Sequence, residues 1–563
     1  MKSGAQILIE GLKEQGVEVI FGYPGGVVLP IYDELYDSDI RHILVRHEQA
    51  AIHAADGFAR ASGKVGVCLA TSGPGACNLV TGLATAYMDS IPVVALTGQV
   101  PTMLLGNDAF QESDITGITM PVTKHNFLVQ DTKDLKRIIR EAFYIAGTGR
   151  KGPVLIDIPK DVSTTMIDDE DGSYQQIRLR GYKPTYQGHG KQVQKAVEAL
   201  TAAKRPIIYA GGGVISSNAS AELIDFAERM CMPVATTLMG LGCIPADHPL
   251  NLGMLGMHGT EYANYAITES DLLFSIGVRF DDRVTGNLAT FAPNAKIIHI
   301  DIDPAEIGKN KQPDVPIVGD ARIILEELLK RIPASCPHPE WSEKVCGWKT
   351  NHPLRFKEDG KLRPQFVIRK LADILGKSGV IVSEVGQNQM WTAQYFKFTR
   401  PRQWISSGGL GTMGYGFPAA MGAQYACPDE PVVVIAGDGS FQMNIQELGT
   451  VAQYQIPVKV VILNNRFLGM VRQWQELFYE HRYSYTELPE VAFARIAEAY
   501  GINAETITES AEVEAALKRA LDHKGPYLLD FRVEREENVF PMVPAGAAIS
   551  EMIVGKHTEH EEE

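Results

Sequence analysis

Two polar residues that follow neighbouring apolar runs have the types and spacing of a metal site. Asp438 lies in Gly-Asp-Gly-Ser after a β-branched run at 432–435, and Asn465 ends an apolar run that begins at Val458. The pattern predicts a strand, a turn, a helix and a second strand. Ligands of open parallel sheets bind outside the carboxyl ends of the strands, so the carboxylate and the amide oxygen, 27 positions apart, can converge there. Such oxygens suit Mg²⁺, which fills its other positions with phosphate oxygens and water.

The glycines that flank Asp438 would let backbone N–H groups approach bound phosphates. Gly-Asp-Gly taken alone is equally well explained as an ordinary turn. Its pairing with Asn464-Asn465 after a second buried strand favours the phosphate site. Gly-Asp-Gly-Ser followed by Asn-Asn resembles the motif of the thiamine-diphosphate enzymes.

Glu48 is the candidate for the acid that would activate a thiazolium cofactor. The cofactor's C2 proton can leave only if its aminopyrimidine ring is protonated, which requires a facing carboxylic acid. Glu48 lies in the stretch that begins at Arg46, directly after the apolar run 42–45, and it stands at the head of a predicted helix, so it would lie at the carboxyl end of a strand. Taken alone, a glutamate in this place is explained as well by favourable charge at a helix N-terminus.

The elements around these residues predict three α/β domains, each with a doubly wound parallel sheet. Nearly continuous Val, Ile and Leu runs alternate with helical patterns, which is typical of strands buried on both faces. The predicted boundaries are 1–185, 193–330 and 365–545 for the domains, with a linker at 331–364 and a tail at 546–563 that ends in HTEHEEE.

The composition excludes several classes of function. The 563 residues are 45% hydrophobic and 21% charged, with a formal net charge of −15 and no basic block, which argues against nucleic-acid binding. The apolar runs are too short to span a membrane. Seven cysteines are scattered without a Cys-x-x-Cys pair, which favours reduced thiols and a cytoplasmic location over a disulfide or zinc framework. The first residues predict an amphipathic helix rather than a targeting leader.

Ten sequence blocks between residues 22 and 475 resemble those of the acetohydroxyacid synthases, a family of thiamine-diphosphate enzymes, and the resemblance extends over about residues 4–553. In chain order they are GYPGG (22–26), HEQ (47–49), ARASGK (59–64), TSGPGA (71–76), TGQVP (97–101), DAFQE (108–112), GMLGMHG (253–259), RFDDRVTGN (279–287), GGLGTMGYGFPAA (408–420) and GMVRQWQ (469–475).

The resemblance implies a pyrimidine-binding domain, a central FAD-binding domain and a domain that binds the diphosphate and Mg²⁺, in that order. It implies the decarboxylation of pyruvate on thiamine diphosphate and transfer of the two-carbon unit to a second pyruvate or to 2-ketobutyrate. The products would be 2-acetolactate or 2-aceto-2-hydroxybutyrate, in valine, leucine and isoleucine biosynthesis. FAD would have a mainly structural role.

The resemblance also implies a role for each matching residue. The metal ligands would be Asp438, Asn465 and the carbonyl of Phe467, and the catalytic residues Glu48, Gln111, Gly25 and Lys160. The other thiamine-diphosphate contacts would be Gln387, Asn388, Gly411, Met413, Gly439 and Ser440. The FAD contacts would be Arg150, Gly211, Gly212, Gly213, Thr237, Leu238, Met257, His258, Gly277, Arg279, Asp301 and Asp320. The substrate contacts would be Arg283, Met470, Val471 and Trp474.

Simpler explanations exist for several of these residues. Met413 would wedge the cofactor into a bent form, but it is also explained as a core residue. Arg283 would pair with a substrate carboxylate, or else with a neighbouring aspartate. Met470 and Trp474, four positions apart, share one face of a helix that would either contact the second substrate or pack in the core.

The resemblance implies partners as well. Each active site would span two subunits, which requires a homodimer or a dimer of dimers, and a separate small regulatory subunit would bind to the assembly. The sequence disfavours three alternatives. GMVRQWQ (469–475) and RFDDRVTGN (279–287) favour the synthase over a pyruvate oxidase that would use its FAD for electron transfer. GMLGMHG (253–259) and RFDDRVTGN argue against an FAD-free catabolic acetolactate synthase, and intact Glu48, Asp438 and Asn465 argue against a catalytically inactive protein that keeps the fold.

Overall fold

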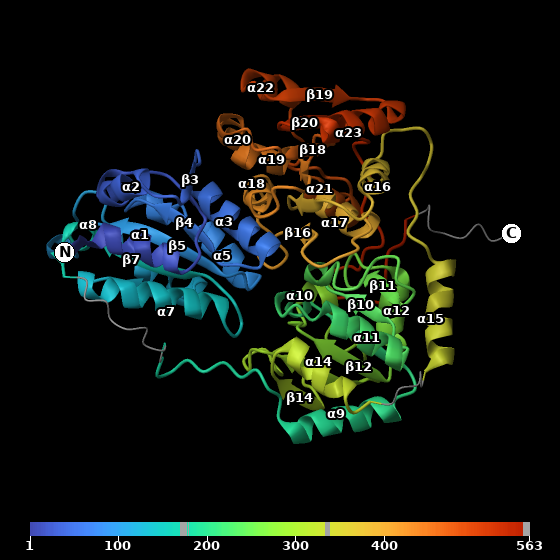
Figure 1. The fold of residues 1–563 in the computed structure, drawn as a ribbon. Coiled ribbons are helices and arrows are strands. Elements are labelled where there is room, and N and C mark those ends of the chain that lie inside the picture. Colours follow the sequence, from blue (N-terminus) through green and yellow to red (C-terminus); the bar gives the residue numbers. More distant parts are fainter. Residues whose placement is uncertain (169–176, 178, 333–337, 556–563) are drawn as a thin grey trace.

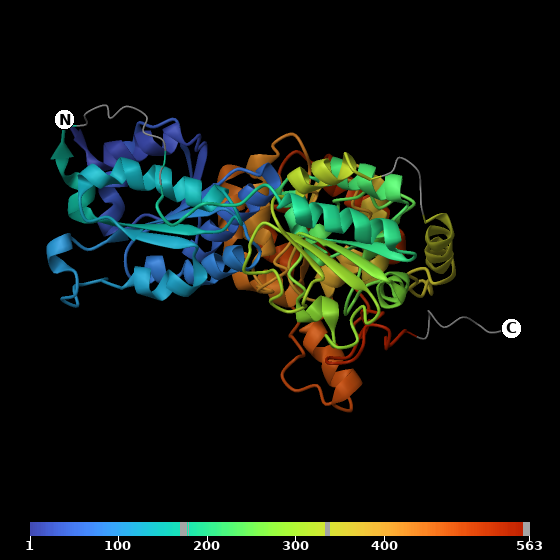
Figure 2. The same cartoon turned by 90° about the horizontal axis from the view of Figure 1, so that it is seen from below.

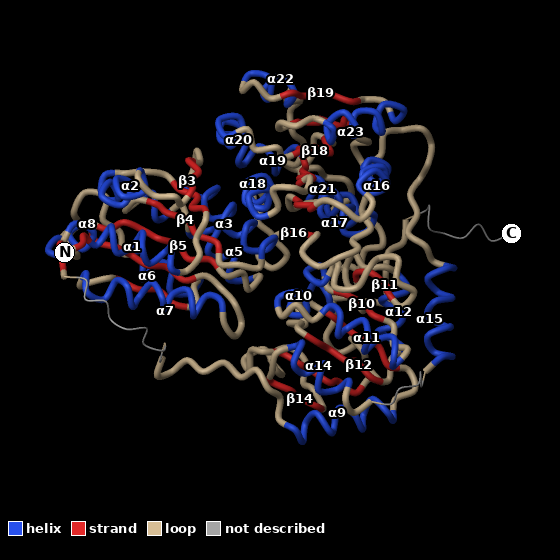
Figure 3. Tube along the Cα trace, in the orientation of Figure 1, coloured by secondary structure: helices blue, strands red, loops and turns tan. Residues whose placement is uncertain are grey.

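The computed structural model describes the whole chain except residues 169–176, 178, 333–337 and 556–563. Its described residues form three six-stranded parallel sheets and a two-stranded antiparallel pair, β1 (Lys2–Ser3) with β8 (Met166–Ile167). Figure 3 shows the strands of each large sheet between helices, and Figures 1 and 2 show the N-terminal domain beside the other two. The prediction of three doubly wound α/β domains is confirmed.

The N-terminal sheet has the strand order β3-β2-β4-β5-β7-β6. Its strands are β2 (Val19–Gly22), β3 (Arg41–Leu44), β4 (Gly66–Ala70), β5 (Val93–Gln99), β6 (His125–Leu128) and β7 (Val154–Pro159). The helices that cover it include α1 (Gly4–Glu14), α2 (Leu29–Tyr36), α3 (Glu48–Ser62), α5 (Val80–Met88) and α7 (Leu135–Gly147). β2, β4, β5 and β7 are buried along their whole length, as expected for strands covered on both faces.

The central sheet has the order β11-β10-β9-β12-β13-β14. Its strands are β9 (Pro206–Ala210), β10 (Val234–Thr236), β11 (Asn251–Met254), β12 (Leu272–Ile276), β13 (Lys296–Asp301) and β14 (Val315–Val318), flanked by α9 (Gly190–Ala202), α11 (Ser220–Met230), α12 (Glu261–Glu269) and α14 (Ala321–Leu329). The stretch 331–364 contains α15 (Pro339–Asn351), which packs on this domain through the buried Trp341, whose Nε1 donates to the Pro206 carbonyl at 2.9 Å.

The C-terminal sheet has the order β16-β15-β17-β18-β20-β19. Its strands are β15 (Val380–Ser383), β16 (Trp404–Ile405), β17 (Val432–Gly437), β18 (Lys459–Asn464), β19 (Asn503–Ile507) and β20 (Tyr527–Arg532). Its helices include α16 (Pro364–Leu375), α17 (Gln387–Tyr395), α18 (Gly416–Ala426), α19 (Asp438–Phe441), α20 (Leu448–Tyr454), α21 (Gly469–Phe478), α22 (Phe493–Ala499) and α23 (Val513–Asp522).

Helices α3 and α18 join the N-terminal and C-terminal domains through a close backbone contact. A Cβ atom on Gly57 would lie 2.0 Å from the carbonyl oxygen of Ala419, and one on Gly422 would lie 1.8 Å from that of Ala54. Any larger residue at either glycine would force the helices apart. One hydrophobic cluster therefore continues from the N-terminal sheet through both helices into the C-terminal sheet.

The end of the chain returns to the central domain. Ile549 is buried in a cluster with Tyr209, and the carbonyl of Ala547 accepts a hydrogen bond from the N–H of Asn287 at 3.0 Å. Residues 547–549 therefore pack on this domain, whereas the expected polar end HTEHEEE lies outside the described residues.

The expectation of reduced thiols throughout the chain is wrong at one position. Cys231 is disulfide-bonded, whereas Cys68, Cys77, Cys243, Cys346 and Cys427 are free. Spacing along the sequence does not reveal which sulfur atoms a fold brings together. Among the described residues, no helix combines the length and the apolar character needed to cross a bilayer.

Candidate active site

Asp438 and Asn465 lie at the same edge of the C-terminal sheet. Strands β17 and β18 pair in parallel, with Gly437 opposite Leu463, so both strands end at the carboxyl edge of the sheet. Asp438 is 2% exposed, and its Oδ1 has no hydrogen-bond partner among the described residues. Burial raises the pKa of Asp438 to about 7. A buried carboxylate oxygen without a partner fits a cation, so the residues present are compatible with Mg²⁺.

Neighbouring residues orient the amide of Asn465. Its Oδ1 accepts a hydrogen bond from the N–H of Phe467 at 3.1 Å, and its Nδ2 donates to Oε1 of Gln387 at 3.2 Å. Gln387 in turn donates to Oε1 of Gln473 in α21 at 2.9 Å. The turn that follows β18 is thereby fixed to the N-terminus of α17 and to α21.

A small cavity of about 70 Å³ lies beside Asp438. Its lining includes seven of the predicted cofactor or metal residues: Gln387, Asn388, Met413, Gly439, Ser440, Asn465 and Phe467. A Cβ atom on Gly439 would lie 2.9 Å from Cδ2 of Leu468, so a side chain at this position would displace the end of Leu468. The absence of side chains beside a helix start leaves backbone N–H groups accessible to a diphosphate.

Met413 lies between the small cavity and a much larger one, and it lines both. Gly411, two positions earlier, has φ +71°, a conformation that favours glycine. The carboxylate of Glu384 holds the segment that follows, because it accepts hydrogen bonds from the N–H groups of Gly414 at 2.8 Å and Phe417 at 3.0 Å. Burial raises the pKa of Glu384 to about 7.

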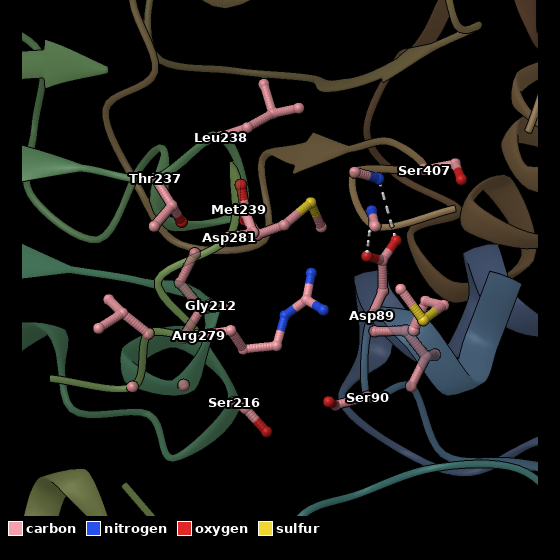
Figure 4. Close-up of a pocket in the computed structure, with 18 of the residues that line it drawn as sticks. Asp89, Ser90, Gly212, Ser216, Thr237, Leu238, Met239, Arg279, Asp281 and Ser407 are labelled. Carbon is pink, nitrogen blue, oxygen red and sulfur yellow. Dashed lines mark hydrogen bonds between the residues drawn. The ribbon is translucent and has the colours of Figure 1, made fainter. Parts of the chain in front are cut away.

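The large cavity, of about 770 Å³, lies where the three domains meet (Figure 4). Eleven of the twelve residues predicted to contact FAD line it: Arg150, Gly212, Gly213, Thr237, Leu238, Met257, His258, Gly277, Arg279, Asp301 and Asp320. In Figure 4, Thr237, Leu238 and Arg279 belong to the central domain, and Asp89 and Ser90 face them from the N-terminal domain.

Gly211, the twelfth residue, lies at the end of β9 beside this cavity, where a Cβ atom would be 2.2 Å from the Gly277 carbonyl oxygen. A Cβ atom on Gly213 would lie 2.6 Å from Cα of Gly277. The ends of β9 and β12 therefore form a surface of bare backbone, which fits the approach of a nucleotide diphosphate. Burial raises the pKa of Asp301, at the end of β13, to about 7.

The four predicted substrate residues line the same cavity. Met470, Val471 and Trp474 come from α21, and the indole N–H of Trp474 has no partner among the described residues. The Arg283 guanidinium lies 3.9 Å from Oδ2 of Asp282, and its side chain is 59% exposed. This contact is too long for a hydrogen bond, so the guanidinium is available to a carboxylate.

Glu48, Gly25 and Gln111 form a separate cluster around the turn at 71–75. Oε2 of Glu48 accepts a hydrogen bond from Nδ2 of Asn78 at 2.9 Å. Cβ atoms built on Gly25 and Gly75 would meet the Thr71 side chain at 2.4 and 2.8 Å, and one on Gly73 would lie 2.7 Å from the Gln111 carbonyl oxygen.

Lys160 lies apart from this cluster, exposed at the start of α8 (Lys160–Thr164). Neither Lys160 nor the three clustered residues line the two cavities described. A single chain thus gathers the predicted metal, diphosphate, flavin and substrate residues around these two cavities, whereas the predicted catalytic residues line neither of them.

Comparison with known proteins places these features in a family. Three models of the thiamine pyrophosphate enzymes match: the N-terminal TPP binding domain over residues 2–118, the central domain over 193–328 and the C-terminal TPP binding domain over 384–531. A probable acetolactate synthase large subunit of Methanococcus aeolicus is 52% identical over 572 residues, covering 98% of this chain and 95% of that protein.

A second probable acetolactate synthase large subunit, from Methanocaldococcus jannaschii, is 53% identical over 561 residues, with 98% and 95% coverage. An acetolactate synthase of Arthrospira platensis is 50% identical over 590 residues, with 98% and 97% coverage. With the whole chain matched at this identity, and the predicted cofactor residues gathered at the sheet edge, the chain belongs to the thiamine pyrophosphate enzymes, among the acetolactate synthase large subunits.

Proposed function

We propose that this chain is the catalytic subunit of an acetolactate synthase, which joins the two-carbon unit of pyruvate to a second pyruvate or to 2-ketobutyrate. Thiamine diphosphate supplies the carbon nucleophile and the electron sink for the decarboxylation. The observation that carries the proposal is Oδ1 of Asp438, which no described residue satisfies, beside Asn465 and inside the region matched by the C-terminal TPP binding model. Mg²⁺ is the cation we propose for these oxygens, with the Phe467 carbonyl as a third ligand.

In this proposal, each group of residues has one task. Glu48 would hold the proton that activates the pyrimidine ring, and Gly25, Gln111 and Lys160 would be further catalytic residues. Arg283 binds the substrate carboxylate, and Trp474 forms a wall for the second ketoacid. FAD occupies the large cavity and takes no electrons, because the joining of two ketoacids is redox-neutral.

We propose further that the active site is completed by a second copy of the chain. Glu48 and Asp438 belong to separate clusters that share no described cavity, and their roles require them to face one cofactor. A dimer in which the Glu48 cluster of one copy faces the Asp438 cluster of the other meets this requirement. The proposal includes dimers of dimers. It also includes a separate small regulatory subunit, which the words "large subunit" in the relatives' names support.

The five free cysteines support a cytoplasmic location, with Cys231 as the exception.

The test is an anaerobic assay of the purified chain with pyruvate, Mg²⁺, thiamine diphosphate and FAD. We expect acetolactate to form without an electron acceptor, and to stop forming when thiamine diphosphate or Mg²⁺ is omitted. Acetate that appears only when an acceptor is added would identify a pyruvate oxidase instead. The visible spectrum of the purified protein separates a flavin-containing synthase from a flavin-free one.

A further inference from the structure

The segment from Gly408 to Tyr415 carries Gly411 and Met413 and runs along the large cavity. The position of this segment decides where the Met413 side chain lies relative to Gly439, whose built Cβ atom would be 3.9 Å from Cε of Met413. Both ends of the segment are held by side chains of the N-terminal domain, none of which belongs to the proposed cofactor contacts.

Asp89, the residue directly after α5, holds the start of the segment. Its Oδ1 accepts a hydrogen bond from the N–H of Gly409 at 2.7 Å, and its Oδ2 accepts one from the N–H of Gly408 at 3.1 Å (Figure 4). The Asp89 side chain is fully buried. Two hydrogen bonds from adjacent backbone groups to one buried carboxylate fix both the position and the orientation of this backbone.

A chain of side chains connects Asp89 to the other end of the segment. Nη2 of Arg60 donates to Oδ2 of Asp89 at 2.8 Å, and Nε of Arg60 donates to Oδ1 of Asp56 at 2.6 Å. The hydroxyl of Tyr415 donates to the same Asp56 oxygen at 2.5 Å. The four residues Asp56, Arg60, Asp89 and Tyr415, here called the Arg60 bridge, thus span the segment from its start to its end.

The Arg60 bridge is buried, so the loss of any one of its contacts would cost more free energy than it would at the surface. Asp56 and Tyr415 are 0% exposed and Arg60 is 6% exposed. Burial raises the pKa of Asp56. The attraction of the Arg60 guanidinium lowers that pKa, but it offsets the effect of burial only in part. Removing one partner of a buried pair leaves the other without compensation, so the bridge has one well-defined arrangement.

Thr412 adds a contact at the middle of the segment. Its Oγ1 lies 2.7 Å from Oγ1 of Thr85, which is in α5. The segment is therefore attached to the N-terminal domain at its start, middle and end. Glu384 holds Gly414, near the end of the segment, and Phe417, just beyond it, to the C-terminal domain.

We infer that the Arg60 bridge positions the segment that carries Met413 against the bound thiamine diphosphate, and that Asp89 is its central positioning residue. Arg60 and Asp89 also line the large cavity, so a ligand that fills the cavity rests against the bridge. Binding in the cavity and binding of thiamine diphosphate should then strengthen each other through the bridge, by equal factors. The identity of the two ligands rests on the proposed function.

The test compares Asp89→Asn and Tyr415→Phe with Asp157→Asn. Asp157 is a matched control because it is a buried aspartate of the same domain that bonds Thr97 and Gln99 within that domain. Calorimetry gives the affinity for thiamine diphosphate with Mg²⁺, with and without saturating FAD. Near-ultraviolet circular dichroism of the bound cofactor reports its conformation independently of turnover.

We expect both bridge variants to bind thiamine diphosphate about 10- to 100-fold more weakly, as loss of a buried charged hydrogen bond implies, and to lose the strengthening by FAD. In the double variant, the loss of binding free energy for thiamine diphosphate should be smaller than the sum of the losses in the two single variants, because both changes break one network. Asp157→Asn should keep the wild-type affinity, the FAD effect and the dichroism. If Asp89→Asn does not fold, Tyr415→Phe carries the same expectation.

Wild-type affinity, FAD effect and dichroism in the folded bridge variants would overturn the inference. A wild-type protein that binds thiamine diphosphate and FAD but forms no acetolactate would contradict the proposed function instead, because the inference concerns binding and not turnover.

Discussion

The carboxylate of Glu447 accepts hydrogen bonds from the backbone N–H of Arg46 through both of its oxygens, at 3.0 and 3.2 Å. Arg46 directly precedes the turn that begins α3 at Glu48, and its Nη2 donates to Oε1 of Gln453 in α20 at 2.7 Å. The C-terminal domain thus fixes the turn that carries Glu48 in the same chain. In the proposed dimer, the helical stretch between Asp438 and Glu447 therefore contacts one active site at its start and supports the other at its end.

Glu447 gives the first prediction, a pH dependence of stability. Burial raises its pKa to about 7, from an ordinary value of 4.5. The folded state therefore binds a proton more tightly than the unfolded state does, and Glu447 costs stability as the pH rises from about 4.5 to 7. Glutamine does not titrate, so the thermal midpoint of the wild type minus that of Glu447→Gln should fall from pH 5 to pH 8. A difference that stays constant or rises would contradict this prediction.

The second prediction concerns Glu48→Gln. The amide cannot hold and release the proton that the pyrimidine ring requires, so turnover should fall roughly 10²- to 10⁴-fold while thiamine diphosphate still binds. The measurements are the rate of acetolactate formation and the calorimetric affinity. Glu18→Gln, which changes an exposed glutamate paired with Lys64, is the control and should keep the wild-type rate. Near-normal turnover in Glu48→Gln would exclude Glu48 from the mechanism.

The third prediction concerns the metal. Asp438→Ala removes the only charged protein ligand proposed for Mg²⁺, so the diphosphate loses the cation that neutralises it and the affinity for thiamine diphosphate should collapse. Asp438→Asn keeps a neutral oxygen and should give an intermediate affinity that improves as Mg²⁺ is raised. Calorimetric titrations at several Mg²⁺ concentrations measure both, with the exposed Asp429→Ala as the control. Unchanged binding by Asp438→Ala would show that the cation lies elsewhere.

Local patterns predicted the part of the site that local geometry determines. A strand, a glycine turn and a helix place Asp438 at a sheet edge, and parallel pairing of β17 with β18 brings Asn465 to the same edge. The same alternation of buried strands and helices predicted the three sheets. No contact between distant residues was needed for either result.

Long-range contacts explain what the sequence did not predict. Glu384 follows the apolar strand β15, and Glu447 lies in a helical stretch, so neither residue stands out in the sequence. The hydrogen bond between Glu447 and Arg46 joins residues 401 positions apart. Such a contact leaves no periodic signal along the chain. The bonded state of Cys231 and the packing of α15 on the central domain depend in the same way on which segments the fold brings together.

The fourth prediction concerns the choice of the second ketoacid. Trp474 lines the large cavity with Met470 and Val471, which supports a substrate wall rather than a core stripe. One additional methylene in a fitted apolar pocket changes preference about 10- to 200-fold. Trp474→Leu should therefore lower the ratio of 2-aceto-2-hydroxybutyrate to 2-acetolactate in a mixed assay, while acetolactate formation from pyruvate alone persists. An unchanged ratio would return Trp474 to a packing role.

The last prediction tests whether the site is built from two chains. Glu48→Gln and Asp438→Ala should each give inactive homodimers. A heterodimer of the two variants has one site with both wild-type residues and one site with neither, provided that Glu48 and Asp438 of different chains meet. Random assembly of equal amounts makes half of the dimers mixed, so activity should recover to about a quarter of the wild-type value.

If Glu48 and Asp438 of the same chain served one cofactor, every site of the heterodimer would lack one of them and activity would not recover. Two different affinity tags on the variants allow the heterodimer to be purified, and its activity per dimer should be about half that of the wild type under the two-chain arrangement. A purified heterodimer without activity would therefore contradict the two-chain site, even if Glu48 and Asp438 are each essential. Recovery would show that the Glu48 turn, held by Glu447 of its own chain, acts on the cofactor bound by the partner.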